Sequence, residues 1–305
     1  MRHIITVACI NFRTKWGKKE INLEKIKEYI DFTAKQGANL IIFPELALTG
    51  CDIESEAKMH KKNAEEIPGF STNEIAKLSE KNNSYVILGM PELVKKEKQI
   101  LYFNSAAVIS PEGVVGSYRK MHPLFDEFKI FNKGNLPFSF LSPWGTIGIG
   151  ICHDTYMFPE IPRFYAALGS RIYINLTAVP ASHIGWKEFY FNQLKARSLE
   201  NSMFVVSANL VGKEIINQYM GSSVIFGPGS GKESHQAYVY GGPASEIKEE
   251  IIISTLDLME TDCIREKYPL FEKNELTGTP DWRLQKYSQM LKIINEETEK
   301  NKYIG

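Results

Sequence analysis

Short runs of apolar and β-branched residues recur along the chain and alternate with polar segments. Nine runs have the length of a single buried strand. They are Ile4–Cys9, Leu40–Phe43, Tyr85–Leu88, Ala106–Ile109, Thr146–Ile151, Ile172–Ile174, Phe204–Ser207, Val224–Phe226 and Ile251–Leu256. The pattern therefore predicts a protein rich in β-structure with little solvent-facing strand surface.

Helical periodicity fills several of the segments between these strands. Leu23, Ile26, Ile30 and Ala34 share one helix face, and Glu24 lies near the helix start, where the helix dipole favours an acid. The other predicted helices lie near Asn73–Lys81, from Pro159 to just before Gly169, over roughly His183–Asn201 and near Pro280–Glu299. The alternation of strands and helices indicates a layered α/β fold.

Some strands follow one another without a helix, and one long segment lacks both patterns. The strands between Tyr85 and Ile109 indicate antiparallel hairpins beside the α/β units. The stretch Phe226–Pro243 is rich in Gly, Ser and Pro, which predicts a loop at the surface or at the rim of a site. No repeat, linker or shift in composition divides the chain, so we expect a single domain over residues 1–305.

The composition excludes several classes of function. Lys plus Arg and Asp plus Glu each number 36 in 305 residues, so the formal net charge is zero. A nucleic-acid binder, whose affinity comes mainly from neutralised phosphates, is therefore not expected, nor is a protein held electrostatically at a membrane. No apolar run approaches the ~20 residues of a membrane span. The N-terminal MRHIITVACINF fits a first strand better than a signal peptide.

The cysteines Cys9, Cys51, Cys152 and Cys263 are scattered, without a CxxC pair or a Cys/His cluster at metal-ligand spacing. We therefore expect no metal site. The four should be free thiols in a reducing cytoplasm, with at least three of them buried.

One of these cysteines ends an apolar strand, in the segment Gly-Ile-Gly-Ile-Cys152-His-Asp. A rigid strand end, a sharp turn and a helix prepared by Pro159 would present a nucleophile beside free backbone N–H groups. The N–H of His153 would then lie close to an oxyanion formed by attack of the Cys152 sulfur. For a lone cysteine, a buried structural role is the commoner explanation.

Two further segments place ionisable groups where they could assist such a nucleophile. Glu45 directly follows the strand Ile-Ile-Phe-Pro, and its apolar neighbours would raise its pKa toward that of a useful base. Lys120, in Tyr-Arg-Lys-Met-His-Pro, could stabilise a thiolate or an oxyanion. Taken singly, a surface glutamate and a solvated basic turn are the commoner explanations.

Taken together, the three segments resemble the nitrilase superfamily of carbon–nitrogen hydrolases, in its amidase-like branch. FPELALTG resembles the glutamate motif of that family, YRKMHPLFDE its lysine motif and GIGICHDTYMFPE its cysteine motif. The spacings also fit, with 75 residues from Glu45 to Lys120 and 32 from Lys120 to Cys152. The resemblance covers a catalytic core from about Ile4 to Leu258, and leaves a C-terminal extension and helix over 259–305.

The resemblance implies a role for each residue. Cys152 would be the nucleophile, Glu45 the general base and Lys120 the oxyanion stabiliser, with the His153 backbone N–H as a second donor. Glu127 matches a further family glutamate, seven residues before Gly134, and would hold Lys120 and the substrate nitrogen. Aromatic residues could line an apolar substrate pocket, although aromatic residues more often serve as core. The candidates for that role are Tyr156, Phe125 and Phe128.

Several neighbouring polar residues are expected to be structural. His122 and the ring of His153 should pack rather than transfer protons, and Asp154 should bond backbone N–H groups. Arg197 and Glu200 should form an ion pair. The chain also departs from the family pattern, because Pro159 follows Cys152 by seven residues rather than six. The extra residue could reshape the pocket beside the nucleophile.

The resemblance implies a four-layer α-β-β-α sandwich that pairs into a homodimer or larger assembly. No metal or organic cofactor is expected, because Cys, Glu and Lys suffice for the chemistry. The leading function is hydrolysis of a small linear amide to a carboxylic acid and ammonia. Hydrolysis of an N-carbamoyl amine or amino acid, or of a nitrile, remains an alternative. A non-catalytic binding protein on the same fold is the fourth possibility.

Overall fold

The computed structural model describes all residues except 53–56, 98, 183–184, 229–235, 268–287 and 294–305. Two six-stranded sheets form its centre. The first has the order β14 (Glu250–Asp257), β1 (Ile4–Asn11), β2 (Leu40–Ile42), β3 (Tyr85–Lys96), β4 (Gln99–Ser110) and β5 (Gly113–Arg119). The second has the order β13 (Tyr238–Gly241), β12 (Val224–Gly227), β9 (Phe204–Asn209), β8 (Ile172–Thr177), β7 (Gly145–Ile151) and β6 (Ser139–Ser142).

Each sheet has parallel strands at its middle and antiparallel strands at its edges. In the first sheet β1, β2 and β3 are parallel, and in the second β7, β8 and β9 are parallel. A short antiparallel hairpin of β10 (Val211–Lys213) and β11 (Gln218–Met220) stands apart from both sheets. The carboxyl ends of parallel strands lie at one sheet edge, which is where α/β proteins place their sites.

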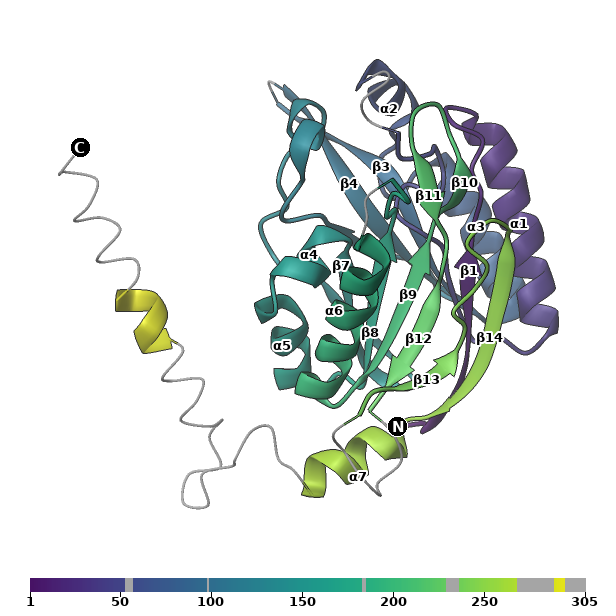
Figure 1. The fold of residues 1–305 in the computed structure, drawn as a ribbon. Coiled ribbons are helices and arrows are strands. Elements are labelled where there is room, and N and C mark those ends of the chain that lie inside the picture. Colours follow the sequence, from purple (N-terminus) through teal and green to yellow (C-terminus); the bar gives the residue numbers. More distant parts are fainter. Residues whose placement is uncertain (53–56, 98, 183–184, 229–235, 268–287, 294–305) are drawn as a thin grey trace.

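Helices cover the outer face of each sheet (Figure 1). Helices α1 (Lys19–Lys35) and α3 (Phe70–Asn82) pack on the first sheet, and α4 (His153–Met157), α5 (Glu160–Ala167) and α6 (Trp186–Asn201) pack on the second. Further helices are α2 (Ala57–Asn63), the 3-10 helix η1 (Phe125–Lys129) and α7 (Met259–Lys267). The predicted four-layer α-β-β-α sandwich is therefore confirmed.

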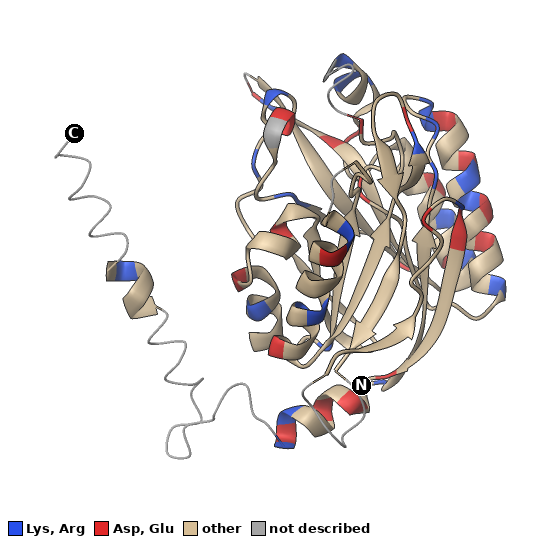
Figure 2. Cartoon of the chain, viewed as in Figure 1, with Lys and Arg blue, Asp and Glu red and all other residues tan. Residues whose placement is uncertain are grey.

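The alternation of side chains along each strand divides the core into layers. In β1, Ile5, Val7 and Cys9 face the space between the sheets, whereas Ala8 and Ile10 face the cluster that includes α1 and α3 residues. A third apolar cluster lies between the second sheet and α5 and α6. Figure 2 shows that Lys, Arg, Asp and Glu gather mainly on the outer helices, while the strands between them are largely uncharged.

Some predicted elements differ from the observed ones. The predicted loop Phe226–Pro243 contains β13 in its described part, with a partly exposed face. Strands β5, β6, β10 and β11, helices α2, α4 and α7 and the 3-10 helix η1 were not predicted, because they are short or carry too few apolar residues to form a clear pattern. Of the last predicted helix, residues 288–293 are helical, and its other residues lie outside the described part of the chain.

The four cysteines are free, as expected, but the prediction that at least three are buried was wrong. Only Cys9 is buried, between the sheets. Cys51 and Cys152 are partly accessible because both face the pocket described below, and Cys263 is exposed on α7. Among the described residues, no helix is long and apolar enough to cross a membrane.

Candidate active site

Cys152 lies in a sharp turn between β7 and α4, in an uncommon backbone conformation. Its φ is 50° and its ψ is −107°, a region that residues other than glycine rarely occupy. Two acceptors on β8 hold this turn, because the Cys152 N–H donates to the backbone oxygen of Leu176 at 2.8 Å and to Asn175 Oδ1 at 3.0 Å. The glycine at 150 is required here, since a Cβ would lie 1.8 Å from the Tyr173 hydroxyl.

Glu45 lies in an equally tight turn after β2. The turn presses against β3, where a Cβ on Gly89 would lie 2.1 Å from the backbone oxygen of Pro44. Leu46, the next residue, has a φ of 48°. The backbone therefore places the Glu45 side chain inward, where only 2% of it is exposed.

Lys120 lies between two buried carboxylates. Its Nζ donates to Glu45 Oε1 and to Glu127 Oε2, each at 2.7 Å. The side chains of Lys120 and Glu127 are 3% and 6% exposed. Glu127 also accepts the backbone N–H of Leu124 at 2.7 Å, which fixes the start of η1. Such close, desolvated ion pairs hold their geometry tightly.

An amide that the sequence did not reveal completes this cluster. Asn104 Nδ2 donates to Glu45 Oε1 at 2.8 Å and to Glu127 Oε1 at 2.9 Å. Asn104 lies on β4, next to the end of β5 that leads to Lys120. The Lys120 backbone N–H donates to the backbone oxygen of Asn104 at 2.8 Å. The only signal in the sequence would have been a polar amide beside the apolar run Ala106–Ile109.

Burial and charge oppose each other at these groups. Burial raises the pKa of Glu45, and Lys120 counteracts this only in part. Burial alone would lower the pKa of Lys120, but Glu127 and Glu45 raise it well above its ordinary value. Burial and the Glu45 carboxylate raise the pKa of Cys152 to about 12, against the opposing effect of Lys120. The Cys152 thiol is therefore protonated at neutral pH and lies near a carboxylate of raised basicity.

Asp154 connects the cysteine segment to the lysine segment. Its carboxylate accepts the backbone N–H groups of Met121 at 3.0 Å and His122 at 2.9 Å, together with the Tyr118 hydroxyl at 2.7 Å. The expectation that Asp154 bonds backbone N–H groups is confirmed, although these groups belong to the lysine loop rather than to its own turn. His122 also bonds Asp154 through Nδ1 and stacks on Phe158 at 3.5 Å.

Arg197 supports the cysteine turn from behind. Its guanidinium donates to the backbone oxygens of Thr155 and Tyr156, at 2.8 and 2.9 Å. It also forms the expected ion pair with Glu200, at 2.9 Å. These bonds satisfy backbone carbonyls of α4, which is too short to satisfy them itself.

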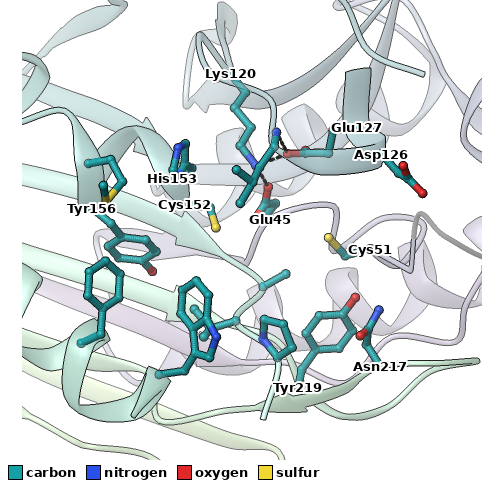
Figure 3. Close-up of a pocket in the computed structure, with 17 residues that line it drawn as sticks. Glu45, Cys51, Lys120, Asp126, Glu127, Cys152, His153, Tyr156, Asn217 and Tyr219 are labelled. Atoms are coloured by element: carbon teal, nitrogen blue, oxygen red, sulfur yellow. Dashed lines mark hydrogen bonds and ion pairs between the residues drawn. The ribbon is translucent and has the colours of Figure 1, made fainter. Parts of the chain in front are cut away.

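The candidate residues meet in one pocket of about 300 Å³. Glu45, Lys120, Glu127 and Cys152 line it, and Figure 3 shows the Cys152 sulfur next to Glu45 and below Lys120. Further lining residues were not singled out from the sequence. They are Cys51, Leu124, Asp126, Met157, Ala178, Val179, Pro180, Trp186, Phe189, Asn217 and Tyr219.

The predicted substrate-binding aromatics have different positions. Tyr156 lines the pocket, and its hydroxyl donates to Thr177 Oγ1 at 2.8 Å. Phe128 is not among the lining residues. It is 56% exposed on the outer side of η1, with the Lys133 ammonium 5.3 Å from its ring centre. The side chain of Phe125 lies outside the part of the chain that the structure describes.

His153, the first residue of α4, lines the pocket and lies edge-on to Phe158. Its pKa is lowered, first by burial and then by Lys120, so the ring is neutral at neutral pH. Within the described part of the chain, no three His, Cys, Asp or Glu side chains are placed to hold a metal ion.

The fold and this site define an α/β sandwich protein whose pocket is lined by a thiol, two glutamates and a lysine. Comparison with known proteins gives the family. The carbon–nitrogen hydrolase family model matches residues 6–264. The chain is 31% identical over 277 residues to a probable nitrilase of Schizosaccharomyces pombe, covering 88% of this chain and 95% of the relative. It is 27% identical over 272 residues to the human omega-amidase NIT2, covering 84% and 90% of the two chains.

A solved structure shares the fold. Nit3 of Saccharomyces cerevisiae, a member of branch 10 of the nitrilase superfamily, superposes with a TM-score of 0.77 at 20% identity, covering 90% of this chain and 98% of that one. The chain belongs to the carbon–nitrogen hydrolase family, within the nitrilase superfamily. It is therefore a carbon–nitrogen hydrolase, as the three motifs indicated.

Proposed function

We propose that this enzyme hydrolyses a small, linear, uncharged amide to a carboxylic acid and ammonia, with Cys152 as nucleophile. The observation that carries the proposal is the cluster in which Lys120 bonds both Glu45 and Glu127 at 2.7 Å beside the Cys152 thiol. An amide needs a nucleophile, a proton carrier for its nitrogen and a donor for its developing oxyanion. The pocket provides one group for each task.

Acylation begins with a neutral thiol, since the pKa of Cys152 is raised to about 12. Its sulfur attacks the amide carbon while its proton passes to Glu45, whose pKa is raised by burial. The carbonyl oxygen becomes an oxyanion that accepts hydrogen bonds from Lys120 Nζ and from the His153 backbone N–H. The C–N bond then breaks, Glu45 returns the proton to the leaving nitrogen, and ammonia departs. The product is a thioester on Cys152.

Deacylation uses the same groups in reverse order. Glu45 takes a proton from water, and the water oxygen attacks the thioester carbon. The second oxyanion rests on the same two donors. The C–S bond breaks, the proton returns to the Cys152 sulfur, and the carboxylic acid leaves.

Glu127 and Asn104 hold the side chains of Lys120 and Glu45 in position through this cycle. Glu127 holds the ammonium at 2.7 Å, and Asn104 bonds both carboxylates. When the proton of Cys152 reaches Glu45, the charge on that carboxylate disappears, and Glu127 remains as the anionic partner of Lys120. The lysine therefore stays protonated and in place to bind the oxyanion.

The charge of the pocket favours an amide without a carboxylate of its own. Among the described lining residues, Lys120 is the only Lys or Arg, and it already lies between two carboxylates. The carboxylate of an N-carbamoyl amino acid would meet Glu127 and Asp126 instead of a second cation. Asp126 is 42% exposed and pairs with the exposed Lys129 at 2.6 Å, a partner that a substrate ammonium group could replace. An N-carbamoyl amine is therefore the second candidate. A nitrile would use the same thiol.

The decisive experiment is ammonia release from matched panels of neutral amides, N-carbamoyl amines, N-carbamoyl amino acids and nitriles. Cys152→Ala is the blank, and Cys263→Ala, which alters an exposed thiol on α7, is the matched control. We expect turnover of neutral amides that Cys152→Ala abolishes and Cys263→Ala retains. If the enzyme turned over only one of the other three classes of compound, that class would replace neutral amides as the proposed substrate. Turnover that survives Cys152→Ala would overturn the assigned nucleophile.

A further inference from the structure

One wall of the pocket comes from two segments of the chain, through residues that are none of the proposed catalytic groups. Cys51 belongs to the turn after Glu45, and Asn217 and Tyr219 belong to the β10–β11 hairpin. Figure 3 shows all three across the cavity from the Cys152 sulfur. An acyl chain that extends across the cavity from a carbonyl carbon at that sulfur would meet this wall. The position of the wall therefore limits the length of the chain.

Two carboxylates join these segments reciprocally. Glu214, in the hairpin turn, accepts the backbone N–H of Cys51 at 3.0 Å and that of Asp52 at 2.8 Å. Asp52 in return accepts the side-chain amide of Asn217 at 2.6 Å and the backbone N–H of Ile216. Each carboxylate thus satisfies backbone or amide donors on the segment that carries the other. We call this set of bonds the carboxylate clamp.

The contact is too close to arise from an ordinary surface turn. Gly50 has a φ of 90°, and a Cβ there would lie 2.7 Å from Glu214 Oε1 and 3.0 Å from Trp16 Cδ1. The Trp16 indole N–H donates to the backbone oxygen of Asp52 at 3.1 Å, and the Thr14 hydroxyl donates to Glu214. Asp52 itself is fully buried. The surroundings therefore hold both partners of the clamp in place.

The hairpin is anchored on its other side. The Met220 backbone N–H donates to the backbone oxygen of Val179 at 3.0 Å, and the Ala181 backbone N–H donates to the backbone oxygen of Gln218 at 2.6 Å. These bonds tie β11 to the segment that follows β8, which also lines the pocket. The carboxylate clamp is thus the connection between this fixed hairpin and the turn that carries Cys51.

We propose that Glu214 and Asp52 are positioning residues that hold the pocket wall opposite Cys152 and so determine which acyl chains fit. The effect on acyl chains rests on the proposed amidase function, whereas the effect on the wall itself does not. Neither residue takes part in a proton transfer of the proposed reaction. Removal of the clamp should release the turn 50–52 and enlarge the acyl side of the pocket, while the cluster around Lys120 keeps its own bonds.

The test compares Glu214→Gln with a matched control, Glu65→Gln. Glu65 likewise accepts a backbone N–H and a hydroxyl, both from Ser71, at 2.7 and 2.8 Å, and it does not line the pocket. Hydrogen exchange at pH 8, above the pKa of about 7 that burial gives Glu214, is followed by mass spectrometry. It should show about tenfold faster exchange of the Cys51 and Asp52 amides in Glu214→Gln only, because each amide loses a charged acceptor. Unchanged exchange in Glu214→Gln would overturn the clamp.

A series of straight-chain amides from acetamide to hexanamide provides the second readout. In Glu214→Gln we expect KM for the longer amides to fall about tenfold relative to KM for acetamide, because the acyl side of the pocket is larger, with kcat for acetamide nearly unchanged. Faster exchange with an unaltered chain-length profile would overturn the role in selection. A wild-type enzyme inactive on every amide would refute the proposed function, and the exchange result would still decide the clamp. If Glu214→Gln does not fold, Asp52→Asn must accelerate exchange at Ile216 and Asn217, or the clamp is refuted.

Discussion

Replacing Lys120 by methionine tests the electrostatic design of the site most directly. Methionine has nearly the length of lysine and no charge, so the change removes the cation and little volume. Glu45 and Glu127 then remain buried, 2% and 6% exposed, without their shared partner at 2.7 Å. Only the Asn104 amide continues to donate to both.

The magnitude follows from this burial. Removal of one partner from a buried ion pair typically costs about 3–5 kcal/mol, because a desolvated charge is left uncompensated. The loss should depend on pH. Burial already raises the pKa of Glu45 against the effect of Lys120, so loss of the lysine raises that pKa further. An acid whose pKa is higher in the folded state binds its proton there, and stability then falls as pH rises through that value.

The expected result for Lys120→Met is therefore a loss of about 3–5 kcal/mol at pH 8 that shrinks by about 1–2 kcal/mol at pH 5.5. Turnover should fall about 10²–10³-fold or more, as when one oxyanion donor is removed. Urea unfolding followed by circular dichroism gives the first quantity, and ammonia release gives the second. Both should be measured at the two pH values.

Two further variants make the test specific. Lys129→Met removes a lysine that is 72% exposed and paired with Asp126, and it should change stability by no more than about 0.5 kcal/mol. Adding Glu127→Gln to Lys120→Met removes one of the unpaired charges and should restore part of the lost stability. If Lys120→Met is as stable as wild type at pH 8, Lys120 does not compensate two buried carboxylates and the reasoning fails.

Three further variants test the supports of the site. Asn104→Leu should cost about 1–3 kcal/mol and lower kcat at least about tenfold, because Glu45 and Glu127 lose their common donor; unchanged unfolding and turnover would contradict this. Burial raises the pKa of Glu214 to about 7, so ionisation of this carboxyl lowers the stability of the wild-type protein as pH rises from 5 to 8. Glutamine does not ionise. The free energy of unfolding of Glu214→Gln, measured in urea, should therefore rise by about 2 kcal/mol relative to that of wild type over this interval. Parallel pH profiles would argue against a buried charge. Asp154→Asn replaces an acceptor of several donors by an amide and should lower kcat more than it alters KM; a change in KM alone would show that Asp154 acts on binding.

The sequence predicted the central residues because each comes soon after the end of a strand. Glu45 comes after β2, Lys120 after β5 and Cys152 after β7, and two of these strands are continuous apolar runs that pattern alone identifies. Strand β5 was missed because only one of its seven residues is buried, so that it lacks a continuous apolar run. The segment that contains Lys120 was identified instead by its resemblance to the lysine motif of the family. The local sequence thus indicated where each group lies in the chain. The family resemblance predicted that the three groups act together in one site.

The partners of these groups could not be predicted, since they depend on pairing between distant segments. Asn104 is 59 positions from Glu45 along the chain, and the two meet only because β4 lies between β3 and β5. The carboxylate clamp joins positions 162 apart, Asp52 and Glu214. No helical or strand period connects such residues. Phe128 shows the opposite limit, because this aromatic residue directly follows the motif residue Glu127 in the sequence but is 56% exposed on η1.

The arrangement of the sheets explains why the site needs the whole sandwich. Glu45 and Lys120 follow the carboxyl ends of two strands of the first sheet, β2 and β5, and Cys152 follows the carboxyl end of β7 in the second sheet. The bonds from Asp154 to Tyr118 and to the lysine loop cross from one sheet to the other, at 2.7 to 3.0 Å. The distance between thiol and ammonium is therefore set by packing between the sheets. Protein interiors are densely packed and yield little, so a void made in the inter-sheet core, far from the pocket, should lower kcat through that distance.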